Sequence, residues 1–511
     1  MTLRSASCPG CGATLDFASA ATVTVVCPHC GGASFRSDVD LEWMGKVAEV
    51  APIASPLSIG ASGRYDGVGW VAIGQVQLDH GRGPWNEWCL LFDDGRHGWY
   101  AEAQGETYLT FPVAFDAAAL PAWPATNAGD AVTVDGRAFV VAEVGEATLV
   151  GVKGEVPQGA LPGSKRRYAD LRGPDAAFGT LDYGPQDRCL EVYVGRTVDP
   201  AALGLAPEQA APVEKKVAAR RLACPSCAGV LELRDPESVR VVCASCGTLV
   251  EPTSSGAKAL GKGAALKAKP LLPLGGKATL AGVAVEVIAY LVRSVTVDGV
   301  RYPWREYLLR TTKGAYRWLA ESNGHWALLD PVNPGDVGRS AGGPVWKGVT
   351  FRHFQGGKAR VDHVQGEVYW EVEVGETVKS DDFVSPPHLL TIEGSGREVN
   401  VTAGSYLEPA AVAQAFSVRV PSPSGVAPSQ PNPYVGHTGR WWAAGLLMLV
   451  GLVVLMATVG GTRGGDAVGA FFPGLFVAAG LLLPPIVVST RRGNFEVRRW
   501  ADSDHPIGGG E

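Results

Sequence analysis

The chain has 511 residues, with 45 Lys or Arg against 51 Asp or Glu, which gives a formal net charge of −6. This length is too great for one domain and predicts roughly three or four domains of about 100–200 residues each. The mild negative charge argues against a protein that coats nucleic acid through bulk charge. The 66 glycines and 36 prolines favour turn-rich β structure and linkers over long helices.

Ten cysteines occur in the chain, and eight of them form four pairs with C-x2-C spacing. The amino-terminal residues contain no apolar run of the length that a signal peptide needs, so we expect no export signal. A long chain without such a signal fits the reducing cytosol, where paired cysteines are usually metal ligands or redox groups.

The paired cysteines fall into two sets with the same C-x2-C-x15-C-x2-C pattern. The first set is Cys8, Cys11, Cys27 and Cys30, and the second set is Cys224, Cys227, Cys243 and Cys246. One constant shift in numbering separates every member of the first set from its counterpart in the second, and chance does not produce four equal shifts. The chain therefore contains a duplicated unit.

Each cysteine set is expected to form a zinc ribbon. Two C-x2-C knuckles joined by a short hairpin supply four thiolates, which is the ligand set of a closed tetrahedral Zn²⁺ site. We therefore expect two Zn²⁺ ions with a structural role, because a closed site has no open position for catalysis. The alternative is a redox C-x2-C motif, but such a motif would not need a partner pair at fixed spacing.

The duplication continues beyond the cysteines. A Trp-x-Glu-aromatic segment and a later Trp and Glu recur at a second constant shift, which gives the pairs Trp85/Trp304, Glu87/Glu306, Trp99/Trp318 and Glu102/Glu321. Gly154-Glu155-Val156 recurs as Gly366-Glu367-Val368. The repeated aromatics are expected to fill a β core, with the glutamates bonding to strand ends or loops. The alternative is a ligand groove lined by paired carboxylates.

The predicted fold is mainly β, because short strands recur at roughly 8–12-residue spacing, as in a barrel or sandwich. The predicted order is zinc ribbon 1 at 1–46, β domain copy 1 at 50–203, a linker at 204–220, zinc ribbon 2 at 221–252, a linker at 253–270, β domain copy 2 at 271–417, a Pro/Ser-rich linker at 418–439, two transmembrane helices at 440–490 and a cytoplasmic tail at 491–511.

Two segments near the carboxyl end, 441–460 and 471–490, contain no charged residue. As helices of roughly 20 residues, each would span about 30 Å, the thickness of a bilayer core. They predict a transmembrane hairpin with the lipid bilayer as the partner of residues 441–490; a buried pair of core helices is the alternative. Basic residues flank the hairpin at Arg440, Arg491, Arg492, Arg498 and Arg499. The positive-inside rule then predicts a multi-pass inner-membrane protein with both termini in the cytoplasm.

The two larger domains resemble a bacterial family known as domain of unknown function 4178. The resemblance rests on the repeated Trp-x-Glu-aromatic segment, the Trp and Glu that follow it, and the Gly-Glu-Val segments, and it covers residues 50–203 and 271–417. It implies no assigned activity. It implies an association, through gene neighbourhood, with membrane-stress proteins and with enzymes similar to those of polyamine synthesis.

Together these patterns predict a membrane-anchored, zinc-binding scaffold that presents duplicated β domains to an unknown protein partner, in a membrane-stress or polyamine-linked system. No catalytic motif occurs, so we expect no enzymatic activity and assign no catalytic residue. One alternative is an enzyme with a groove lined by the four repeated glutamates. Another is nucleic-acid binding through ribbon 2, which is flanked by Lys215, Lys216, Arg220 and Arg221. The sequence does not indicate a small-molecule ligand.

Overall fold

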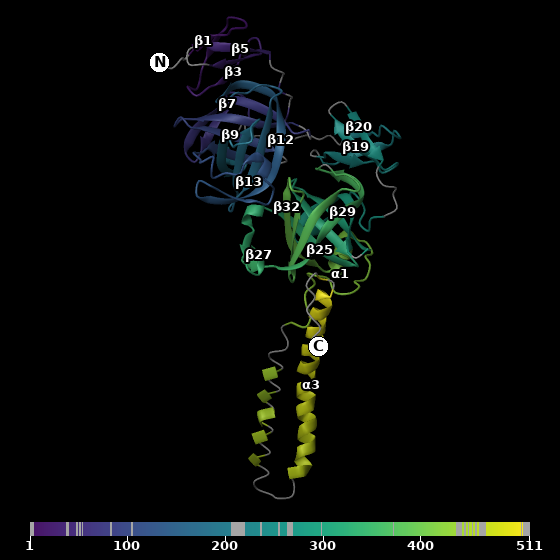
Figure 1. The fold of residues 1–511 in the computed structure, drawn as a ribbon. Helices are drawn as coiled ribbons and strands as arrows, with labels where there is room; N and C mark the ends of the chain where they lie inside the picture. The colour runs from purple at the N-terminus through teal and green to yellow at the C-terminus, as the bar shows by residue number, and fades with distance from the viewer. Residues whose placement is uncertain are drawn as a thin grey trace.

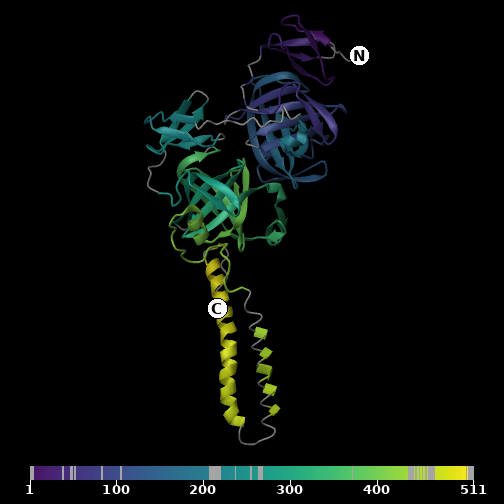
Figure 2. The ribbon, with the colours of Figure 1, turned by 180° about the vertical axis from the view of Figure 1, so that it is seen from behind.

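A computed structural model gives the fold (Figure 1). It describes residues 5–36, 40–46, 50, 53, 55–81, 84–103, 106–205, 220–235, 238–253, 256–262, 269–297, 299–370, 372–435, 467–501 and 503, and, between 442 and 458, residues 442–443, 446–447, 449–451, 453–454 and 457–458. The described chain is mainly β, which confirms the predicted class. Ribbon 1, barrel 1, barrel 2 and a long helix follow one another along the molecule, with ribbon 2 at the side (Figures 1 and 2).

The two ribbon units, each of which carries one set of four cysteines, are built alike. Ribbon 1 contains β1 (Ser5–Ser7), β2 (Thr14–Asp16), β3 (Thr24–Val26), β4 (Gly32–Arg36) and β5 (Leu41–Lys46). Ribbon 2 contains β16 (Arg220–Ala223), β17 (Val230–Leu233), β18 (Arg240–Val242), β19 (Thr248–Thr253) and β20 (Gly256–Lys262). In each unit the first two strands form a separate hairpin, and the other three form a meander that joins the sheet of the following barrel.

Barrel 1 is a closed antiparallel barrel of eight strands. It contains β7 (Val68–Asp79), β8 (Pro84–Phe92), β9 (His97–Ala103), β10 (Glu106–Pro112), β12 (Arg137–Val156), β13 (Lys165–Arg172), β14 (Ala177–Gly184) and β15 (Glu191–Thr197). Their order is β7-β8-β9-β10-β15-β14-β13-β12, and pairing of β12 with β7 closes the barrel. Two short strands, β6 (Ser62–Tyr65) and β11 (Ala131–Val134), pair at its margins. The 3-10 helices η1 (Trp123–Ala125) and η2 (Pro200–Leu203) lie in connections.

Barrel 2 repeats this topology. It contains β22 (Val283–Val297), β23 (Val300–Thr311), β24 (Tyr316–Ser322), β25 (His325–Val332), β29 (Arg352–Val368), β30 (Thr377–Ser385), β31 (His388–Gly394) and β32 (Val399–Leu407). Pairing of β29 with β22 closes it in the same order as barrel 1. The additional strands are β21 (Lys277–Leu280), β26 (Gly338–Ser340), β27 (Gly343–Trp346) and β28 (Val349–Thr350), with the 3-10 helix η3 (Pro334–Asp336) before the last three. The closed order excludes the sandwich alternative.

Side chains alternate between the lumen and the outer face of each barrel, as strand geometry requires. In β8, Trp88 and Leu90 pack outward in a cluster that includes Leu203 from η2. Trp85 and Cys89 point the other way, into a cluster with Leu149 of β12. In barrel 2, Arg293 of β22 reaches Glu393 of β31 at 2.7 Å. Because β22 and β31 are not neighbours in the sheet, their side chains can meet only across the lumen, so Arg293 and Glu393 point into the barrel.

The two barrels contact each other through backbone and side-chain hydrogen bonds. Asn333, just before η3, donates from Nδ2 to the carbonyl oxygen of Gly173 at 2.9 Å. The amide of Asp175 donates to Asp336 at 3.1 Å, and the amide of Val144 donates to the carbonyl oxygen of Arg397 at 2.7 Å. The contact therefore joins β12 and a turn of barrel 1 to two connections of barrel 2.

Helices α1 and α3 both pack on barrel 2. Helix α1 (Pro409–Phe416) places Val412 and Phe416 in the outer cluster of the barrel. Helix α3 (Ala467–Trp500) docks its last turn on the same barrel. There Trp500 packs against Phe354 with ring centroids 5.5 Å apart, and Arg499 donates to the carbonyl oxygen of Pro428 at 2.7 Å.

The predicted membrane location is not supported by this structure. Among the residues that the structure describes, no helix is both long and apolar enough to cross a bilayer. The prediction of a multi-pass inner-membrane protein with cytoplasmic termini is therefore wrong, and the transmembrane hairpin at 440–490 has no support. Helix α3 does not end near residue 490 but runs on through its arginines to Trp500, which packs on barrel 2. Part of 441–460 and all of 461–466 lie outside the described residues.

Candidate functional sites: two cysteine clusters and two barrel lumens

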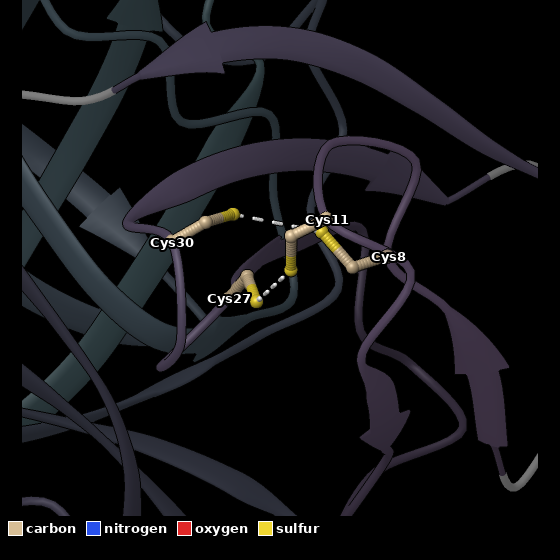
Figure 3. A group of neighbouring side chains, drawn as sticks. All are labelled: Cys8, Cys11, Cys27 and Cys30. Carbon is tan, nitrogen blue, oxygen red and sulfur yellow. Dashed lines mark hydrogen bonds between the residues drawn. The ribbon is translucent and has the colours of Figure 1, made fainter.

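The structure brings the first cysteine set together between the turn that joins β1 to β2 and the turn that joins β3 to β4 (Figure 3). The sulfur atoms of Cys8 and Cys30 are 3.7 Å apart, as are those of Cys11 and Cys27. All four sulfurs lie within 4.8 Å of one another. Zn–S bonds of about 2.3 Å place tetrahedral ligands about 3.8 Å apart, so this set fits a tetrahedral ion such as zinc.

The second cysteine set has the same geometry. Cys224 and Cys246 are 3.7 Å apart at sulfur, and so are Cys227 and Cys243. The first knuckle closes with a hydrogen bond of 2.8 Å from the amide of Ala228 to the carbonyl oxygen of Cys224. Ala228 adopts a φ of +57°, the left-handed conformation that glycine provides in the other knuckles. The chain therefore offers two sets of four cysteines that could each hold one metal ion.

The repeated Gly-Glu-Val segment joins each ribbon to its barrel. Glu155 is buried and accepts hydrogen bonds from the amide of Ala18 at 2.9 Å and the hydroxyl of Thr22 at 2.6 Å. Its counterpart Glu367 accepts from the amide of Arg234 at 2.7 Å and the hydroxyl of Ser238 at 3.0 Å. A buried carboxylate that accepts several hydrogen bonds fixes the loop around it. Each glutamate therefore holds a loop of the ribbon against the end of the barrel.

The glycine that begins each Gly-Glu-Val segment is required because a neighbouring strand approaches it closely. Gly154 has a φ of +67° and Gly366 a φ of +94°. A Cβ atom at either position would lie 2.2 Å from a backbone carbonyl oxygen, that of Ile73 or Ile288. Only glycine tolerates both the conformation and the contact.

The repeated glutamates of the sequence pattern lie on two different faces of each barrel. Glu87 lies in the lumen of barrel 1, whereas Glu102 lies on the outer face and accepts from Trp88 at 3.2 Å. Glu306 likewise lies in the lumen of barrel 2, and Glu321 bonds on the outer face with Arg305 at 2.5 Å. The two glutamates of each barrel therefore point to opposite faces of its sheet, although all four line the same connected cavity.

The lumen of barrel 1 instead gathers other carboxyl groups around Glu87. Trp85 donates from its indole to Glu87 at 3.0 Å, and Thr180 donates to Asp170 at 2.8 Å. Tyr168 donates to Glu143 at 3.0 Å. Burial raises the pKa of Glu87. Burial and the neighbouring charge of Glu143 raise the pKa of Asp170 to about 7.

Two arginines of this lumen already have acidic partners. Arg166 pairs with Asp182 at 3.0 Å, and Arg172 pairs with Glu106 at 2.7 Å. Among the described residues, no ion pair joins an arginine to Glu87, Glu143 or Asp170. Within that part of the chain, these three carboxyl groups in the lumen of barrel 1 therefore form no ion pair with an arginine.

The lumen of barrel 2 repeats the carboxyl groups at equivalent places in the strand register. Trp304 donates to Glu306 at 2.6 Å, as Trp85 does to Glu87. Thr391 donates to Asp382 at 2.6 Å, and burial raises the pKa of Asp382. The register pairs Asp382 with Thr391 and Asp170 with Thr180, and it sets Glu393 at the position of Asp182.

The lumens differ in charge at several positions. Val378 and Val384 of barrel 2 stand where barrel 1 has Arg166 and Arg172, and two further positions differ as well. Gln355 replaces Glu143 and donates its amide to Asp382 at 3.0 Å. Arg293 replaces Leu78, and its Nη1 lies 2.7 Å from Glu393 and 3.4 Å from Glu306. Barrel 2 therefore supplies its own cation and a neutral donor where barrel 1 has a leucine and a carboxyl group.

Both lumens open into one connected cavity of ≈ 3130 Å³, which reaches Glu87, Asp170, Glu306 and Asp382. A single small-molecule pocket has about 300–1,000 Å³, so this volume is a system of spaces rather than one site. The protein surrounds these carboxyl groups, but they line the cavity, so a small molecule that enters the cavity can reach them.

Three comparisons place the chain among known proteins. The profile of a family described as Domain of unknown function (DUF4178) matches residues 58–200 and 273–409, one match for each barrel. The chain matches none of the curated proteins and none of the solved structures with which it was compared. The two family matches together cover more than half of the chain. This chain is therefore a member of the DUF4178 family that carries the family domain twice.

Proposed function

We propose that this chain is a binding and assembly protein in which two zinc ribbons stabilise two barrel receptacles of fixed mutual orientation. The observation that carries the proposal is the acidic lumen, repeated at equivalent positions in both barrels. One Zn²⁺ in each four-cysteine set would cross-link two knuckles and supply stability to a ribbon too small to hold a large core.

The acidic lumens support a binding function because they cost stability. Burial raises the pKa of Glu87, Asp170 and Asp382, which means that the folded protein disfavours their charged forms. Replacing buried charges by well-packed apolar groups is often neutral or stabilising. Their repetition in both barrels is therefore better explained by recognition than by stability.

The contact between the barrels supports a scaffold. The hydrogen bonds from Asn333 to Gly173 and from Val144 to Arg397 hold the two lumens in one arrangement. A partner that engages both barrels gains from the high effective concentration of the second site.

The test uses the full chain with isosteric amides in both lumens, Glu87→Gln together with Glu306→Gln. Binding partners are recovered from the source cells with wild-type and variant protein, and the melting temperature of each protein is measured. The proposal expects the folded variant to lose the partners that the wild type retains, with some loss of stability because Glu306→Gln removes a carboxylate partner of the buried Arg293. Unchanged partners on a folded variant would contradict it.

The control is Glu102→Gln, which alters a carboxyl group on the outer face and leaves both lumens intact. It should retain the partners of the wild type. Loss of the same partners with this control would show that the outer face, and not the lumen, is responsible.

A further inference from the structure

The two lumens are built on one plan but differ in charge at several positions, and one of these lies directly opposite the repeated tryptophan. Leu78 pairs with Trp85 on the next strand, and Arg293 pairs with Trp304 in the same register. In barrel 2 the guanidinium carbon of Arg293 lies 5.7 Å from the centre of the Trp304 ring. Its Nη1 bonds to the two carboxylates that correspond to Glu87 and Asp182 of barrel 1.

Barrel 2 therefore shows which group the shared arrangement of acids and tryptophan accommodates. It is a planar organic cation, held by carboxylates and placed beside an indole ring, a combination that cation–π attraction and charge-assisted hydrogen bonds favour. In barrel 1 the equivalent side chain is Leu78, which is buried in the lumen cluster and carries no charge.

The remaining charges of barrel 1 suit a cation at this place. Arg166 is paired with Asp182 and Arg172 with Glu106. Glu87, Glu143 and Asp170 remain, and the cavity reaches all three. Trp85 and Tyr168 stand beside them with ring centroids 6.4 Å apart, so aromatic faces line the same space.

Divalent metal ions fit this lumen less well than an organic cation does. Within the part of the chain that the structure describes, the residues that bring three or more ligand atoms within 4.8 Å of one another are the two cysteine sets. The lumen carboxyl groups are thus too dispersed for one small ion, but they suit a larger cation whose hydrogen-bond donors point in several directions.

We propose that the lumen of barrel 1 binds an organic cation with a terminal guanidinium or ammonium group, which takes the place that Arg293 fills in barrel 2. The proposal rests on the proposed function of the lumens and names the ligand class for one of them. Barrel 2 is already satisfied by Arg293, so the wild-type chain has one such site.

The test is a calorimetric titration of the zinc-loaded full chain with n-butylguanidinium and, separately, n-butylammonium at pH 8. Wild-type protein should bind at least one of these probes saturably, with n-butyrate and Mg²⁺ as probes that should not bind in the lumen. The variant Leu78→Arg places an internal guanidinium beside Trp85 and should weaken binding at least about tenfold. Leu78→Met keeps an apolar side chain of similar volume and should bind as the wild type does.

A second variant, Glu87→Gln, tests the same site if the Leu78→Arg protein does not fold. Glu87→Gln keeps the shape of the side chain, removes its charge, and should also weaken binding at least about tenfold. The proposal is overturned if wild-type protein binds neither cation at about 10 mM, or if folded Leu78→Arg and Glu87→Gln proteins bind with wild-type affinity.

Failure of this inference is distinguishable from failure of the proposed function. If no cation binds but the lumen amide variants still lose their partners, the ligand class is wrong and the lumens remain binding sites. If a cation binds but partner recovery does not depend on the lumens, the site exists and the scaffold proposal is wrong.

Discussion

Leu78 and Arg293 occupy the same position in the two barrels, each directly opposite a tryptophan of the next strand. Most of the surrounding acids are shared, so this substitution changes the charge of the lumen without changing its plan. A duplicated domain in which one copy places an arginine opposite this tryptophan and the other places a leucine there is a natural comparison, because each barrel serves as the reference for the other.

Metal content should follow the two cysteine sets. We expect two zinc ions per wild-type chain and about one in Cys8→Ser, because removing a thiolate opens one closed tetrahedral site. Cys189→Ser is the control, since Cys189 is a buried free cysteine outside both clusters. Metal analysis of purified protein measures the ratio, and a folded, metal-free wild type would show that the clusters are not metal sites.

The glutamate that joins ribbon 1 to barrel 1 should matter for stability. Glu155→Gln removes the charge and one acceptor from a carboxylate that bonds to Ala18 and Thr22. We expect a loss of about 2 kcal/mol in the free energy of local unfolding, read as faster amide hydrogen exchange in ribbon 1.

The control for that change is Glu146→Gln, because Glu146 forms an exposed pair with Lys165 and exposed pairs contribute little. Equal hydrogen exchange in the Glu155→Gln and Glu146→Gln proteins would mean that the buried bonds to the ribbon do not hold it in place.

Asp170 should make the stability of barrel 1 depend on pH. Its pKa in the folded protein is about 7, against an ordinary value of 3.8, so its contribution is complete below pH 3.8 and is lost as the pH rises through 7. Relative to wild type, Asp170→Asn should therefore gain stability between about pH 4 and pH 7, by at most about 4 kcal/mol. Urea unfolding at several pH values measures this difference.

Glu143 contributes to that pH dependence through its charge. Glu143→Gln copies Gln355 of barrel 2, and it should lower the pKa of Asp170 and reduce the pH dependence. A stability difference between Asp170→Asn and wild type that stays constant from pH 4 to pH 8 would show that Asp170 does not titrate in this range.

The mutual orientation of the barrels should depend on one amide. Asn333→Asp keeps the acceptor that bonds to the amide of Gly335 but removes the donor to the carbonyl oxygen of Gly173. We expect the barrels to sample more orientations, seen as a broader distance distribution between spin labels placed on the two barrels. A distribution as narrow as that of the wild type would assign the orientation to the other contacts.

Much of the architecture can be predicted from the sequence. The equal shift of the paired cysteines predicts two ribbons, and the repeated segments around Trp85 and Trp304 predict two β domains. Turn and strand patterns also predict that these domains are β, but they cannot decide between a barrel and a sandwich. Closure depends on the pairing of β12 with β7, two strands that lie far apart in the chain, and no local pattern reports such a pairing.

The lumen is harder to predict because it depends on which face of a strand is interior. Both Glu87 and Glu102 recur in the second copy, which suggests that they belong to one site. Trp99 lies in the lumen cluster, however, and Glu102 follows it by an odd number of positions in the same strand, so Glu102 points to the outer face. The alternation of Arg166, Tyr168 and Asp170 along one strand is a sequence pattern that indicates a polar interior face. Asp182 and Glu143 escape detection by repetition because their counterparts are Glu393 and Gln355, which are not identical residues.

The long apolar segments near the carboxyl end lead to a wrong prediction of location. Hydropathy and flanking arginines describe a segment without its tertiary contacts, and here the arginine-containing end of α3 packs Trp500 on Phe354 of barrel 2. Arg499 is 1% exposed, so it is part of a packed junction rather than a free flanking charge.

The number of cation sites per chain tests the central claim most directly. Arg293→Leu copies Leu78 into barrel 2 and frees Glu306 and Glu393, so calorimetry with n-butylguanidinium should rise from one site per chain in the wild type to two in the variant. A folded Arg293→Leu protein that still binds one cation, or none, would contradict the account that Arg293 fills the place that barrel 1 keeps for a ligand.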